Sequence, residues 1–96
     1  MTLPLLIILP PLVMPQVSLN GTSKNDLVDQ QLAIVGALRL VQDALSAAAP
    51  NGRDYQQRPH EYEGARTAWV ERQALIANLR REIEHHAEAI DALPGK

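Results

Sequence analysis

Residues 62–93 read YEGARTAWVERQALIANLRREIEHHAEAIDAL, and this stretch decides the fold. Its large apolar side chains recur at seven-residue spacing, at Tyr62, Trp69, Ile76, Ile83 and Ile90. A second set follows each of them by three residues and consists of Ala65, Arg72, Leu79, His86 and Leu93. A heptad seam sustained over this length predicts a long helix packed against another helix.

The ends of this helix are marked by proline. Pro59 is expected in the first turn, where a missing N–H costs nothing, and Glu61 lies near the positive N-terminal end of the helix. Pro94 ends the pattern. Two seam positions, Arg72 and His86, are polar, which indicates either that they extend to solvent or that they set register and oligomer state.

A second amphipathic helix is predicted upstream, from the cap at Thr22-Ser23 to about Ala49. Ser23 is a suitable N-cap, and Asp26 places a negative charge in the first turn. Pro50 cannot continue the helix. The broad apolar stripe comprises Leu27, Ile34, Val41 and Ala48, the interleaved Gln31, Leu38 and Leu45, and the widening Val28, Leu32 and Val35. Such a width favours packing against more than one neighbour.

Together these patterns predict an all-α fold, an antiparallel two-helix hairpin with long helices over residues 16–93. A chain of 96 residues forms at most one domain. Two helices alone leave much of each apolar stripe in water, so we expect the hairpins to assemble into a homo-oligomeric bundle.

The first fifteen residues, MTLPLLIILPPLVMP, differ from the rest in being apolar and rich in proline. The apolar run is too short and too interrupted for a membrane-spanning helix, and it lacks the basic start and cleavage site of a signal peptide. Three interpretations remain for residues 1–15: an over-long start with Met14 as the true first residue, an apolar arm docked on a neighbouring subunit, and a membrane-associated segment.

Composition excludes several functional classes. The chain has no cysteine, which removes thiolate metal sites, disulfides and a cysteine nucleophile and fits a cytoplasmic protein. A net charge of −2 and three aromatic residues argue against a DNA- or RNA-binding protein. No cofactor motif is present, and a membrane partner is not expected.

The loop between the helices is the strongest candidate site. Its structural interpretation is a turn, in which Pro50 ends one helix and Asn51-Gly52 reverses the chain. Its functional interpretation is an anion-binding corner built from exposed backbone N–H groups, planar guanidinium groups and the start of the second helix. The candidate ligand-binding residues are Asn51, Gly52, Arg53, Asp54, Tyr55 and Arg58. Tyr55 could stack on a base or sugar, and Asp54 could accept from ribose hydroxyls or orient Arg53.

Catalytic and metal-binding patterns are weak. Glu82 and His85 have the Glu-x-x-His spacing of di-iron bundles, but such sites need a second motif and further carboxylates. Solvated or register-setting histidines are the favoured interpretation. No Ser-His-Asp set, phosphate-binding loop or dinucleotide fingerprint occurs, so we expect neither an enzyme nor a metal protein.

The motifs Leu19-Asn20-Gly21-Thr22-Ser23 and Ala49-Pro50-Asn51-Gly52-Arg53-Asp54-Tyr55 resemble those of small tailed-phage and prophage proteins over roughly residues 17–92. In those proteins two tyrosines often follow the aspartate, whereas Gln56 follows Tyr55 here. By analogy, the resemblance implies a non-enzymatic anti-defence protein of the host-cell cytoplasm, an oligomer that binds and sequesters a phosphate-bearing, nucleotide-like signal molecule. The alternative is a protein–protein inhibitor or adaptor that acts on a host defence protein through its helical face.

Overall fold

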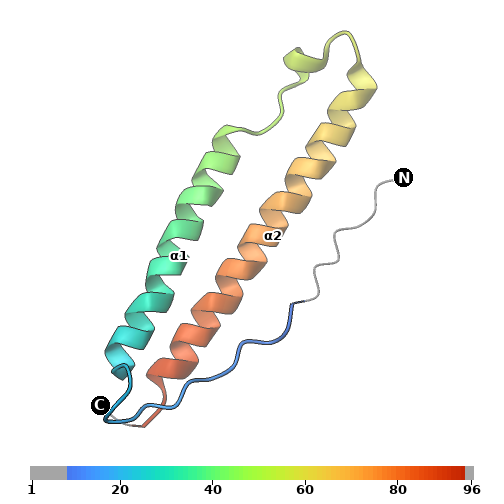
Figure 1. Cartoon of the computed structure of the whole chain (residues 1–96). Coiled ribbons are helices and arrows are strands. Elements are labelled where there is room, and N and C mark those ends of the chain that lie inside the picture. The colour runs from blue at the N-terminus through green and yellow to red at the C-terminus, as the bar shows by residue number, and fades with distance from the viewer. Residues whose placement is uncertain (1–8, 95–96) are drawn as a thin grey trace.

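The computed structural model describes residues 9–94 and contains two long helices (Figure 1). Helix α1 spans Lys24–Ala47 and helix α2 spans Pro59–Asp91, with a short 3₁₀ turn, η1, over Gly52–Tyr55 between them. The two helices lie side by side and run antiparallel, so the molecule is an elongated hairpin of 63 × 26 × 17 Å. The predicted all-α antiparallel hairpin is confirmed.

Local chemistry explains where the helices begin and end. Ser23 has an extended backbone, and its Oγ accepts from the N–H of Asp26 at 3.1 Å, as an N-cap does. Helix α1 ends at Ala47, two residues before the predicted end, and Ala48 closes it with 3.1 Å bonds to the carbonyls of Ala44 and Leu45. Pro59 opens α2 at the predicted residue.

The predicted seam of α2 lies largely out of water. Ile83 and Ile90 are buried, and the other three members of the seven-residue set are half-buried. Of the two polar seam residues, His86 is half-buried, whereas Arg72 is exposed and donates to the carbonyl of Ala68 on its own helix at 3.1 Å. Arg72 therefore extends to solvent in the hairpin.

Helix α1 divides its apolar residues between two faces. Val35 is buried, and Leu38 and Leu45 are half-buried on the side turned to α2. Ile34, Val41 and Ala48 from the predicted stripe are exposed. The stripe is wider than one neighbouring helix can cover, so the hairpin buries one part of it and leaves the other in water.

The polar side-chain pairs between the two helices gather at one edge of the hairpin. Gln42 Oε1 accepts from Arg80 at 2.8 Å, and Glu84 Oε1 lies 3.2 Å from Arg80 Nε and 3.8 Å from Arg39 Nη2. The Arg80–Glu84 contact is close but poorly aligned for a hydrogen bond, so it acts as an ion pair. Farther along the hairpin, Gln73 donates to Ser46 at 3.2 Å. We call this side the polar edge.

The hairpin has a very small core. Within residues 9–94, only Val35, Ile83, Ala87 and Ile90 are buried. Many large apolar side chains remain exposed, including Leu32, Leu40, Val70 and Leu75. Such a surface suggests that the hairpin self-associates, since a soluble monomer seldom exposes so much apolar area.

The N-terminal segment is extended where the structure describes it. In residues 9–17 no regular element forms, and Leu9, Leu12 and Val13 are exposed while Val17 is half-buried. Residues 1–8 of the predicted arm lie outside the described part of the chain. Neither described helix is long and apolar enough to cross a membrane.

Candidate functional site

The loop that joins the helices is a tight, internally bonded turn. The side-chain oxygen of Asn51 accepts from the N–H of Arg53 at 3.0 Å, and its carbonyl accepts from the N–H of Asp54 at 3.0 Å. Asn51 therefore caps η1 as Ser23 caps α1. Gly52 opens η1 and has open space where a Cβ would stand. Asn51 and Gly52 therefore shape the loop. The N–H groups of Arg53 and Asp54 already donate to Asn51 and are not free for a ligand.

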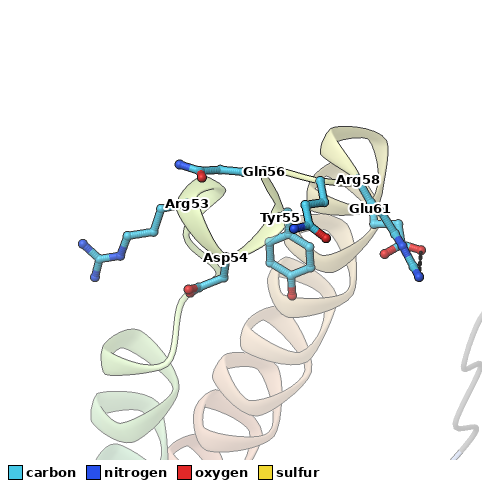
Figure 2. Close-up of a pocket in the computed structure, with 7 residues that line it drawn as sticks. Arg53, Asp54, Tyr55, Gln56, Arg58 and Glu61 are labelled. Carbon is cyan, nitrogen blue, oxygen red and sulfur yellow. Dashed lines mark hydrogen bonds and ion pairs between the residues drawn. The ribbon is translucent and has the colours of Figure 1, made fainter.

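A depression of about 430 Å³ opens at this end of the hairpin (Figure 2). Its lining consists of Arg53, Asp54, Tyr55, Gln56, Gln57, Arg58 and Glu61. The volume falls within the range of small-molecule sites, although the depression is open to solvent rather than enclosed. The loop thus offers a solvent-open polar surface large enough for a small molecule.

The two arginines of the depression point in different directions. Figure 2 shows the guanidinium of Arg53 extending away from Tyr55, on the side opposite Arg58. Arg58 Nη1 lies 3.4 Å from Glu61 Oε1, an exposed pair one helical turn apart at the start of α2. With Asp54 also in the lining, two positive groups are balanced by two negative ones. One chain alone therefore does not gather positive charge at a single point.

Tyr55 forms the aromatic part of the site. Its ring centre lies 6.0 Å from that of Tyr62, with the ring planes tilted by 48°. This arrangement is a favourable aromatic pairing that joins η1 to the first turns of α2. The Tyr55 carbonyl accepts from the N–H of Arg58 at 3.1 Å, which fixes the path of the loop into α2. The half-buried Tyr55 ring is thus held in place beside the depression.

The structure brings together four of the six predicted ligand-binding residues. Arg53, Asp54, Tyr55 and Arg58 line the depression, whereas Asn51 and Gly52 lie outside its lining and support it. Three further lining residues were missed by sequence reasoning, namely Gln56, Gln57 and Glu61. Glu61 stands three residues after Arg58, the N-cap residue of α2, and this spacing could have predicted their pairing. No sequence feature apart from their position in the loop identifies Gln56 and Gln57 as lining residues.

Elsewhere the described residues offer little chemistry. A second depression of about 300 Å³ is lined by Val28, Leu32, Glu84, Ala87, Glu88 and Asp91. Its three carboxylates make it unsuitable for an anionic ligand. No group of three or more potential metal ligands occurs among residues 9–94, and His85 of the Glu82–His85 pair is exposed.

Comparison with protein-family models, with curated proteins and with solved structures found no match to this chain.

Proposed function

We propose that this chain is a non-enzymatic, homo-oligomeric protein that binds and sequesters a phosphate-bearing, nucleotide-like molecule at the α1–α2 loop. The observation that carries the proposal is the depression there, which combines Arg53 and Arg58 with the Tyr55 ring. Guanidinium groups bind phosphate through paired hydrogen bonds, and an aromatic ring provides a surface for a base. The glutamine amides add neutral donors and acceptors suited to a sugar or a base edge.

An inter-subunit site fits this geometry better than a site within one chain. Because Arg53 and Arg58 point apart, a single loop directs only one guanidinium at a given ligand. In an oligomer, a second chain beside the loop supplies the opposite wall and removes water from the depression. The same contact strengthens each charged hydrogen bond, since the local dielectric falls. The exposed apolar surface of the helices supports such an oligomer.

The test is calorimetric titration of the purified protein with ribonucleoside mono- and triphosphates and with dinucleotides. We expect at least one of these probes to bind, and Arg53→Ala to abolish the binding while helicity and oligomer mass stay unchanged. Arg66→Ala is the matched control, because Arg66 is an exposed arginine of α2 outside the depression. Equal affinity in the wild type and Arg53→Ala would overturn the proposal.

The biological setting of the proposal comes from the loop motifs. Their resemblance to motifs of small phage proteins favours a role in which the sequestered molecule is a host defence signal. Sequestration needs a stable oligomer with repeated pockets, and it requires no chemical reaction. The sequence is compatible with such a role, since it carries no cysteine and no catalytic motif.

A second candidate function is favoured by the exposed apolar residues outside the loop. In this account the chain is an inhibitor or adaptor of a host protein, and the helical face and the N-terminal arm make the contact. Deletion of residues 1–13, or charge reversal at Arg66 and Arg81 on the exposed side of α2, would then abolish co-purification of that protein. Arg53→Ala would leave it intact, which separates this function from the first.

A further inference from the structure

The exposed side of α1 carries a second heptad seam. Five exposed apolar residues follow one another at spacings of three and four, namely Ile34, Ala37, Val41, Ala44 and Ala48. Ala33, Leu40 and Ala47 flank them and are exposed as well. We call these eight residues the outer seam. No charged side chain belongs to it, and Leu40 at its middle is 71% exposed.

The outer seam lies away from the polar edge. Arg39, Gln42 and Ser46 make the side-chain contacts from α1 to α2 at that edge. At about 100° per residue, these positions lie on the other side of the helix from Ala37, Ala44 and Ala48. One side of α1 is therefore joined to α2 by polar groups, whereas the other side is apolar and has no polar partner among the described residues.

We propose that the outer seam binds the outer seam of a second copy of this chain, with the two α1 helices antiparallel. A second copy is the favoured partner because large and small side chains of the two seams are complementary in this alignment. In an antiparallel alignment of such a seam, Ile34 faces the partner's Ala44, and Ala37 faces the partner's Val41. Every central layer then pairs a branched side chain with an alanine, so the two helices approach closely without a void. An uncharged seam also meets its own copy without repulsion.

The angle between the two seams of α1 fits a four-helix arrangement. The residues turned towards α2, such as Val35, Leu38 and Leu45, each follow a member of the outer seam by one position. The two seams are therefore about 100° apart around the helix axis. Helices at the corners of a four-helix bundle contact two neighbours at nearly this angle. Helix α1 can thus pack on its own α2 and on the partner's α1 at once.

The area that this contact can bury reaches the lower limit for a specific dimer. Ile34 and Val41 are 41% and 43% exposed, and the alanines of the seam are exposed too. Two outer seams together would remove on the order of 1,000 Å² from water, which is about the lower limit for a stable interface. Half-buried side chains beside the seam, Leu38 and Leu45, would add to this area.

This inference rests on the proposed function, which requires a homo-oligomer. It specifies how two chains of that oligomer pack against each other. In the antiparallel alignment the loop of each chain lies beside the first turns of the partner's α1. The second wall of the loop depression would then come from the start of the partner's α1.

Single cysteines test the alignment, because the natural chain has none. Ile34→Cys and Ala44→Cys are made separately, and the two proteins carry tags of different mass. They are unfolded together, refolded and oxidised under mild conditions, and covalent dimers are read by mass spectrometry. In the proposed alignment equal positions lie about 15 Å apart along the axis, too far for a disulfide, whereas the mixed pair is in range.

The expected result is a covalent heterodimer in the mixture and at least tenfold less dimer in either protein alone. Asp43→Cys, on the charged side of α1, is the matched control and should form no dimer with any variant. Strong dimers of each single variant would indicate a parallel pair and overturn the proposal. An absence of covalent dimers in all samples would also overturn it. Nucleotide titration of the same variants reports separately on the proposed function, which survives if binding and an oligomer persist without this cross-link.

Discussion

Trp69 Nε1 donates a hydrogen bond to the backbone carbonyl of Leu45 at 2.7 Å, and this contact joins the half of the α2 seam nearer the loop to the last turn of α1. The Leu45 carbonyl also accepts from the N–H of Ala48 at 3.1 Å, so the indole supplies the second hydrogen bond to a carbonyl oxygen that has two lone pairs. Trp69 and Leu45 are both half-buried, so this hydrogen bond lies partly out of water. The contact therefore fixes the register of the two helices close to the loop.

Trp69→Phe keeps an aromatic ring in the seam and removes the donor. We expect unfolding to become easier by roughly 1 kcal/mol, the usual net contribution of one hydrogen bond. For a domain of this size, that loss lowers the melting temperature by about 4–8 °C. Thermal unfolding followed by circular dichroism measures it. A melting temperature equal to that of the wild type would show that the bond contributes nothing.

Glu84→Gln removes the carboxylate that lies between Arg80 and Arg39 at the polar edge. These side chains are partly exposed, so we expect a loss of less than about 1 kcal/mol. Because salt screens such pairs, the difference between Glu84→Gln and the wild type should shrink in 1 M NaCl. Urea titrations at low and high salt make the comparison. A loss that is independent of salt would mean that packing, not charge, explains it.

Asn51→Ala removes the side-chain acceptor that caps η1, whereas Asn51→Asp keeps one. Since Asn51 supports the depression without lining it, we expect Asn51→Ala to weaken nucleotide binding at least fivefold and Asn51→Asp to weaken it less. Calorimetric titration gives both affinities. Equal losses in the two variants would indicate that the amide contacts the ligand itself and that capping is not its role.

Leu40→Glu places a charge at the middle of the outer seam. Leucine and glutamate have similar helix propensities, so the hairpin should keep its helicity while the oligomer dissociates. Gly36→Glu is the matched control, because it adds the same charge at an exposed α1 position outside the seam, where a Cβ meets no atom within 4 Å. Sedimentation velocity reads the mass of each variant. Dissociation of both variants, or of neither, would argue against the outer seam as the interface.

The hairpin could be predicted from sequence because its signals are local and agree with one another. The heptad spacing from Tyr62 to Ile90, the cap at Ser23 and the prolines at 50 and 59 each specify a helix or its end. In contrast, the division of the α1 stripe could not be predicted. Ile34 and Val35 are both β-branched and differ by one position, and only the packing of α2 decides that Val35 is buried while Ile34 is exposed.

The position of the candidate site in the loop could be predicted from the sequence, whereas the directions of its side chains could not. Turn residues and arginines locate the loop, and four predicted residues line its depression. The directions of Arg53 and Arg58 depend on side-chain partners, such as Glu61, which bonds Arg58 across one helical turn. The loop sequence did not define these partners, so it suggested a convergence of positive charge that the single chain does not have.

The central claim is an oligomer that holds a small phosphate-bearing molecule, and a native mass spectrum of the full chain purified without added ligand tests it most directly. The account predicts a discrete oligomer with an even number of subunits that carries extra mass in a fixed ratio to its subunits. Denaturation should release that mass, and Arg53→Ala should lack it while keeping the oligomer. A bare monomer in the native spectrum would contradict the account.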